Sequence, residues 1–131
     1  MELPETVRKQ LVTALQEDNR IAAAYLLGSA ARGSMRADSD IDIAVLPFPS
    51  IKLTSVDLAN IAGSLSYELG RQVDMGLLSS ANLLYARQVL GSGIRLFSKD
   101  PYYVDLMETS LISMYLWFNE ERKELVHAYT N

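Results

Sequence analysis

The sequence predicts a small α/β or α+β domain in which short buried strands alternate with helices. The chain has 131 residues, the usual size of one compact domain, so we expect a single domain over residues 1–131. Hydrophobic residues make up 49% and charged residues 21% of the chain, as in ordinary globular proteins. Segments with helical periodicity also alternate with shorter apolar runs, which is the pattern of a sheet covered by helices.

The first four elements are expected to be a helix, a strand, a loop and a second strand. Apolar residues recur at helical spacing over residues 4–17, and residues 21–27 form an almost wholly apolar run typical of a buried strand. Residues 30–38 are small, polar and basic, which indicates a loop with one helical turn. Residues 40–46 are rich in β-branched side chains, which predicts a strand.

A second helix and a third strand follow. Apolar residues again lie on or near one face over residues 55–69, where Ser55 is the expected cap and Gly70 the expected end. Residues 72–78 predict a strand.

The last part of the chain predicts a short helix over residues 80–90 capped by Ser80, an edge strand over residues 94–97, and a long helix over residues 101–128. The apolar residues of this last helix surround more than one face, so either several sides are buried in the domain or part of the surface docks a partner protein. They are Leu106, Met107, Leu111, Ile112, Met114, Tyr115, Leu116, Trp117 and Phe118.

Composition excludes several classes of function. The net charge of −4 argues against a protein that grips nucleic acid through clustered Lys and Arg. The absence of cysteine excludes disulfides and thiolate chemistry, and the single histidine, His127, argues against a Ser-His-Asp triad. Neither a signal peptide nor an apolar run of membrane-spanning length is visible, so we expect no membrane partner and a cytoplasmic location.

Two acidic residues open the strand expected over residues 40–46. Asp40 and Asp42 are two positions apart, so in a strand they share one face, while Ile41, Ile43 and Val45 face the core. Adjacent carboxylates repel unless a cation lies between them, and paired carboxylates suit Mg²⁺. The alternative is that both acids simply face solvent at the start of the strand.

Two further features of the sequence, Gly28-Ser29 and Asp74, are candidates for the same site as this pair of acids. Gly28 and Ser29 follow a buried strand directly, where a backbone approaches a ligand closely and where phosphate binds readily, although an ordinary turn with a serine cap has the same sequence. Asp74 lies in the third strand among apolar residues. If that strand neighbours the Asp40–Asp42 strand, Asp74 completes a three-acid cluster; otherwise it is a lone exposed acid.

The combination resembles the signature of the DNA polymerase β-like nucleotidyltransferase superfamily: Gly28-Ser29, ten residues, Asp40-Ile41-Asp42, and a third aspartate, Asp74, downstream. The length and the Ser39-Asp40-Ile41-Asp42 detail are most similar to the minimal nucleotidyltransferase (MNT) group. The resemblance covers about residues 21–78. It implies a small mixed sheet with helices packed on one face.

The same resemblance implies a role for each matching residue. Asp40 and Asp42 would bridge two Mg²⁺ ions, and Asp74 would hold the catalytic ion and help to deprotonate the incoming hydroxyl. Gly28 and Ser29 would hold the β- and γ-phosphates of ATP. Two ions of this kind stabilise both the attacking and the leaving oxygens of an in-line displacement.

Two neighbouring residues are assigned less directly. Arg32 either contacts a phosphate or pairs with Asp38 on the surface. Ser39 is expected to hydrogen-bond backbone beside the acids rather than act as a nucleophile, since the sequence offers it no base.

MNT proteins commonly act as antitoxins beside a helical HEPN-domain toxin, so the resemblance implies that this chain transfers AMP from ATP to a tyrosine hydroxyl of such an RNase toxin. The chain has no room for a second, acceptor-binding domain, which fits a protein acceptor that brings its own recognition. Two alternatives remain: a binding antitoxin that only covers the toxin, and a small-molecule nucleotidyltransferase of the antibiotic-modifying type.

Overall fold

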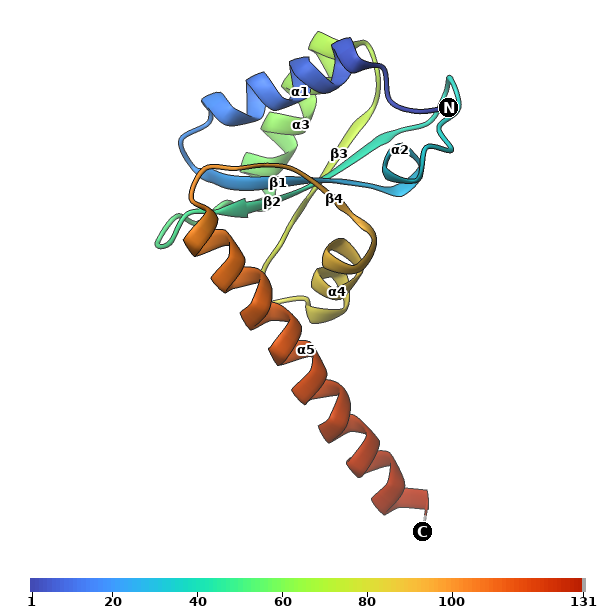
Figure 1. The fold of residues 1–131 in the computed structure, drawn as a ribbon, viewed down its shortest axis with the longest axis vertical. Helices are drawn as coiled ribbons and strands as arrows, with labels where there is room; N and C mark the ends of the chain where they lie inside the picture. The colour runs from blue at the N-terminus through green and yellow to red at the C-terminus, as the bar shows by residue number, and fades with distance from the viewer. Residues whose placement is uncertain (131) are drawn as a thin grey trace.

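The computed structural model describes residues 1–130 and contains a four-stranded mixed sheet with helices on both of its faces (Figure 1). The strands lie in the order β3-β2-β1-β4, where β1 is antiparallel to β2 and β4, and β2 is parallel to β3. The elements are α1 (Glu5–Glu17), β1 (Ile21–Leu27), α2 (Gly28–Arg32), β2 (Ile41–Pro47), α3 (Ser55–Leu69), β3 (Val73–Leu77), α4 (Leu83–Ser92), β4 (Ile94–Ser98) and α5 (Pro101–Thr130).

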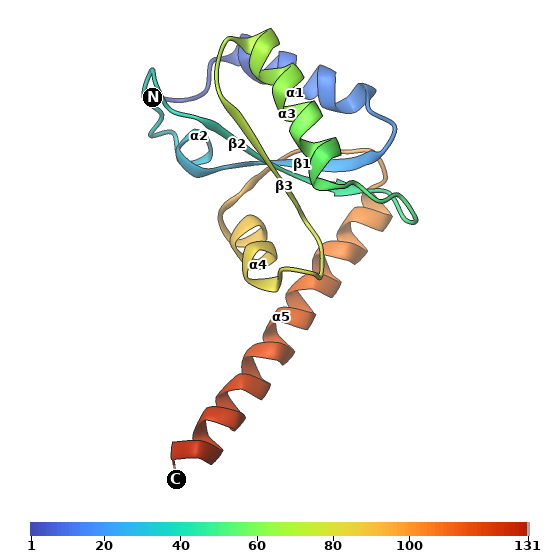
Figure 2. The same cartoon turned by 180° about the vertical axis from the view of Figure 1, so that it is seen from behind.

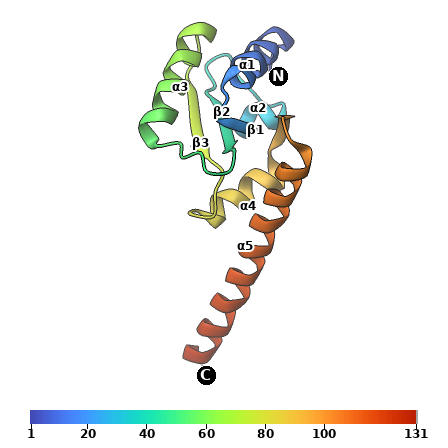
Figure 3. The ribbon, with the colours of Figure 1, turned by 90° about the vertical axis from the view of Figure 1, so that its left-hand side faces the viewer.

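The sheet separates two hydrophobic layers, because alternate residues of a strand face opposite sides. Leu26, Ile41 and Ile43 face α1 and α3, whereas Tyr25 and Ala44 face α4 and α5. Figure 3 shows α1 and α3 on one side of the strands and α4 and α5 on the other. The expectation that helices cover only one face is therefore wrong. All seven residues of β1 are buried, as the uninterrupted apolar run requires.

The strands and long helices lie where the sequence predicts them, but two helix caps do not. The cap of α3 is Thr54 rather than Ser55: its Oγ1 accepts a hydrogen bond from the Asp57 backbone N–H at 3.1 Å, and Asp57 Oδ2 accepts the Thr54 N–H at 2.9 Å. This reciprocal pair satisfies two helix-end donors at once. The cap of α4 is Asn82 rather than Ser80.

The long helix α5 leaves the body of the domain (Figures 1 and 2). Its amino-terminal half packs on the sheet through the buried Val104 and Leu111. Beyond it, the apolar surface is open to solvent, with Trp117 67% exposed. Burial of α5 on several sides is therefore wrong, and the alternative, a surface available to a partner, fits the structure. None of the helices described is both long and apolar enough to cross a bilayer.

Three side-chain contacts fix the direction of α5. The hydroxyl of Tyr25, a buried residue of β1 on the side of α4 and α5, donates to Glu108 Oε2 at 2.7 Å. Arg95 of β4 pairs with the same carboxylate at 2.8 Å. Burial first, and the hydrogen bond to Glu108 second, raise the pKa of Tyr25, so the phenol keeps its proton and remains a donor. The Tyr103 hydroxyl donates to the Pro47 carbonyl at 3.0 Å. The helix therefore leaves the domain in a defined direction.

Candidate active site

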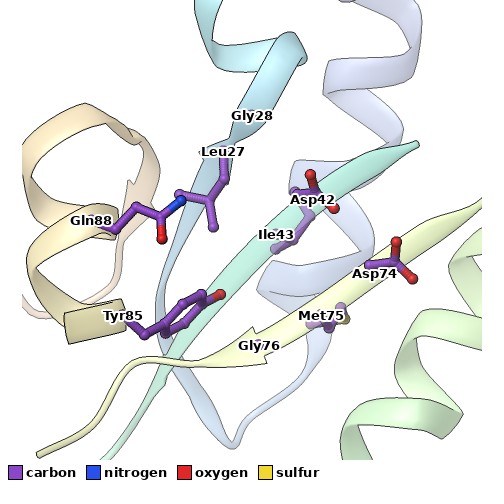
Figure 4. Close-up of a pocket in the computed structure, with 9 residues that line it drawn as sticks. All are labelled: Leu27, Gly28, Asp42, Ile43, Asp74, Met75, Gly76, Tyr85 and Gln88. Carbon is purple, nitrogen blue, oxygen red and sulfur yellow. The ribbon is translucent and has the colours of Figure 1, made fainter. Parts of the chain in front are cut away.

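Asp42 and Asp74 lie side by side on neighbouring strands. The parallel register of β2 and β3 places them directly opposite each other, which confirms that the third strand neighbours the second. Figure 4 shows both side chains at the edge of a hollow between the strands and α4. The hollow has a volume of about 330 Å³. It is lined by Leu27, Gly28, Asp42, Ile43, Asp74, Met75, Gly76, Tyr85 and Gln88.

Gly28 faces the Asp42 carboxylate at the end of β1. The antiparallel register places Leu27 opposite Asp42, so the turn into α2 begins beside the acid. Gly28 has a φ of +63°, and a Cβ atom at this position would lie 2.8 Å from Asp42 Oδ2. Glycine is needed here for two reasons, namely the left-handed backbone and the close approach of the carboxylate. The turn that follows β1 therefore lies directly against the Asp42 carboxylate.

Asp42 lies near two other negative charges and forms no ion pair among the described residues. Burial, and then the negative charges of Asp74 and Asp40, raise the pKa of the Asp42 carboxyl. Among the ion pairs of residues 1–130, none involves these three aspartates. Gln72 Nε2 donates to Asp74 Oδ1 at 3.2 Å, a neutral contact that leaves the charge uncompensated. A cation entering this site would relieve the repulsion.

Asp40 lies at the margin of the site rather than inside it. It is exposed, directly precedes β2, and is not among the residues that line the hollow. Within residues 1–130, no three acidic or histidine side chains are gathered closely enough to form a ready-made metal cage. The expected three-acid cluster is therefore only partly formed: Asp42 and Asp74 lie together, and Asp40 lies at the margin. Mutual repulsion of three like charges is a sufficient physical reason for the open arrangement.

The remaining predicted residues differ in position. Ser39 Oγ accepts a hydrogen bond from the Arg36 backbone N–H at 2.8 Å, so its predicted backbone contact is confirmed. Ser29 lies in the first turn of α2, next to Gly28. Arg32 lines a separate hollow of about 220 Å³ beside α1, away from Asp42, and the described ion pairs include none between Arg32 and Asp38. The surface pairing with Asp38 is therefore not formed, and the phosphate contact of Arg32 stays a prediction.

Two residues of α4 that the motif does not include complete the hollow. Tyr85 and Gln88 face Asp42 across it (Figure 4). Gly76 of β3 makes room for the tyrosine, since a Cβ there would collide with the Tyr85 hydroxyl. Burial, and then the charge of Asp42, raise the pKa of Tyr85, so the phenol stays protonated. Their spacing of three residues places them on one helix face, but only the fold shows which face meets the acids.

Comparison with known proteins gives consistent matches. The family model described as polymerase beta nucleotidyltransferase matches residues 9–102. The protein adenylyltransferase MntA of Shewanella oneidensis is 29% identical over 124 residues, which are 93% of this chain and 87% of MntA.

Solved structures agree with this. A chain in the crystal structure of a toxin–antitoxin with AMP-PNP has a TM-score of 0.78 and 28% identity, over 95% of this chain and 98% of that chain. A chain in the structure of the tri-AMPylated Shewanella oneidensis HEPN toxin in complex with MNT antitoxin has a TM-score of 0.73 and 26% identity, over 97% of this chain and 98% of that chain. With the family model covering most of the chain, and with Gly28, Asp42 and Asp74 meeting as the motif requires, this protein belongs to the polymerase beta nucleotidyltransferase family.

Proposed function

We propose that this protein is an antitoxin that transfers AMP from ATP to a hydroxyl group, a tyrosine in our model of the reaction, of a HEPN-domain RNase toxin. The observation that carries the proposal is the hollow in which Gly28 faces the Asp42–Asp74 pair. The adenylyltransferase and the toxin–antitoxin complexes to which the chain is similar support the choice of acceptor. We further propose that residues 1–131 act as one domain, since both hydrophobic layers share a single sheet.

In the proposed reaction, the acceptor oxygen attacks the α-phosphorus of ATP. A bond forms between that oxygen and phosphorus, the bond from phosphorus to the oxygen that bridges to the β-phosphate breaks, and pyrophosphate leaves. Gly28 and Ser29 hold the β- and γ-phosphates, because the glycine lets the backbone approach closely. Asp74, at the exposed edge of the site, receives or directs the hydroxyl proton. Positioning and charge stabilisation supply most of the catalysis in reactions of this kind.

The donor set fits magnesium. Asp40, Asp42 and Asp74 offer hard carboxylate oxygens. Burial, and then the charges of Asp74 and Asp40, raise the pKa of Asp42, so a bound cation would favour its charged form. In our proposal, these three aspartates hold two Mg²⁺ ions. When bound, the ions neutralise charge on the phosphates and on the leaving group.

We place the docking surface for the toxin on the exposed half of α5. Its large apolar side chains include Met114 (44% exposed), Leu116 (56%), Trp117 (67%) and Phe118 (43%). Large apolar side chains gathered on an exposed segment mark protein–protein interfaces, and aromatic residues and Met are enriched in them. The occupant is the HEPN toxin, because the solved structures that match nearly the whole chain include a HEPN toxin bound to an MNT antitoxin.

The test is intact mass spectrometry of the co-expressed toxin after incubation with this protein and Mg-ATP. We expect a mass gain of one or more AMP units with the wild-type protein and none with the Asp40→Ala, Asp42→Ala double variant. A tight complex without any mass gain would instead support the non-catalytic binding antitoxin. Transfer of AMP to small hydroxyl compounds but not to the toxin would support the small-molecule enzyme.

A further inference from the structure

Two of the three residues that join α3 to β3, Arg71 and Gln72, contact the start of β2 and the turn that precedes it. Arg71 Nη2 lies 3.0 Å from the Arg36 carbonyl oxygen, 3.0 Å from that of Ser39, and 3.3 Å from that of Ala37. A terminal guanidinium nitrogen carries two N–H groups, so one of them is shared between two carbonyls. Hydrogen bonds from a charged donor are stronger than neutral ones. One arginine therefore donates hydrogen bonds to both ends of the turn over residues 36–39.

The same connector reaches both neighbours of Asp40. Arg71 binds the carbonyl of Ser39, the residue before Asp40, while the Gln72 carbonyl accepts the N–H of Ile41, the residue after it, at 2.9 Å. The turn is closed internally as well, since the Ser39 N–H donates to the Arg36 carbonyl at 3.1 Å and Ser39 Oγ accepts the Arg36 N–H. Asp40 thus lies between two contacts of the connector: the Arg71 hydrogen bond to Ser39 before it, and the first hydrogen bond of the β2–β3 pairing, from Ile41 after it.

Asp40 needs this support more than Asp42 does. Asp42 lies within β2, in register with strands on both sides, whereas Asp40 is exposed and precedes the strand. A ligating carboxylate must be held within roughly 0.5 Å of its working position, by neighbours that are themselves fixed. We propose that Arg71 is a positioning residue that holds Asp40 in place for metal and nucleotide binding. The inference rests on the proposed function, in which Asp40 is one of three working carboxylates.

The contacts of Arg71 indicate how it acts. Its hydrogen-bond partners are carbonyl oxygens, not the carboxylates of Asp40, Asp42 or Asp74. The guanidinium therefore fixes the path of the backbone and does not serve as a counter-ion. The signature of such a residue is a loss of turnover with little change in nucleotide affinity, because Gly28 and Ser29, which hold the phosphates in our proposal, lie on other elements.

The test compares Arg71→Ala and Arg71→Lys with Arg8→Ala, a matched change on α1 that lies outside the site. We expect Arg71→Ala to lower kcat for AMP transfer roughly 10- to 100-fold, since misplacement by about 1 Å costs that much, while KM for ATP changes by less than about threefold. Arg71→Lys, which retains a charged donor, should recover part of kcat. A kcat for Arg71→Ala equal to that of Arg8→Ala would overturn the proposal.

Hydrogen–deuterium exchange supplies a readout that needs no activity. In Arg71→Ala, the amides of residues 36–41 should exchange at least about tenfold faster, while those of β1 keep their protection. Unchanged exchange in residues 36–41 overturns the positioning role even if the wild-type protein transfers AMP. If residues 36–41 exchange faster in Arg71→Ala but the wild-type protein transfers no AMP, the positioning role of Arg71 stands and the proposed function is refuted. If Arg71→Ala does not fold, Arg71→Lys carries both measurements: intermediate exchange and kcat support the role, and wild-type values contradict it.

Discussion

Replacing Gly28 with alanine gives a strong test of the site geometry. Gly28 has a φ of +63°, where a non-glycine residue costs about 1–2 kcal/mol. The new Cβ would also lie 2.8 Å from Asp42 Oδ2, whereas ordinary van der Waals contact begins at 3.4 Å, so the carboxylate must retreat by about 0.6 Å. A displacement of about 1 Å costs on the order of 100-fold in rate, so we expect AMP transfer to fall by roughly tenfold or more.

Gly70 provides the matched control. Its φ of +65° is nearly the same, and a Cβ there would meet nothing within 4 Å. Gly70→Ala should therefore lose about the same 1–2 kcal/mol of unfolding free energy from the left-handed backbone while its transfer rate stays near the wild-type value. The difference between the two variants isolates the contact with Asp42.

The assay measures the unfolding free energy of each variant in urea and the initial rate of AMP transfer to the toxin at a temperature where both variants are folded. A transfer rate for Gly28→Ala that stays near the wild-type value would refute the assignment of Gly28 to the reacting site. Equal loss of activity in both variants would attribute the effect to backbone strain alone.

Three other variants test separate parts of the account. Asp42→Asn should raise the unfolding free energy at neutral pH, because the raised pKa of Asp42 makes its charged form unfavourable in the fold. This gain in stability should vanish as the pH falls below the unfolded-state pKa. The same variant should lower the rate of AMP transfer by roughly 100-fold or more. Tyr25→Phe removes the donor to Glu108 and should cost about 1.5 kcal/mol in urea unfolding, with Arg95 still pairing the carboxylate. Trp117→Ala, at an exposed site, should change the stability of the isolated chain by less than about 0.5 kcal/mol but weaken toxin binding at least about tenfold by calorimetry.

The sequence predicts those features that depend on local pattern. The apolar run of β1 and the periodicity of α3 mark their elements, and the i, i+2 spacing of Asp40 and Asp42 marks the candidate site. That Asp74 lies opposite Asp42 depends on strand order, which the local pattern leaves open and the register of β2 and β3 shows. The cap at Thr54 is also local, but Ser55 has a side chain of the same kind, so the sequence could not decide between neighbours.

The sequence does not predict the features that depend on long-range contact. Tyr85 is one polar residue among several on α4 until Gly76 and Asp42 are placed against it. Arg71 is distant in sequence from Arg36, whose carbonyl accepts its hydrogen bond. The exposed apolar half of α5 has a composition that suits a buried helix equally well. Only the three-dimensional structure shows that this half extends past the sheet and that nothing within residues 1–130 covers it.

The most direct test of the central claim follows the phosphate that is transferred. The toxin is incubated with this protein and with ATP labelled at either the α- or the γ-phosphate, in parallel with the Asp42→Asn variant. The account predicts that the α-label becomes bound to the toxin, that the γ-label leaves in pyrophosphate, and that the variant transfers neither. Incorporation of the γ-label, or full transfer by Asp42→Asn, would contradict it.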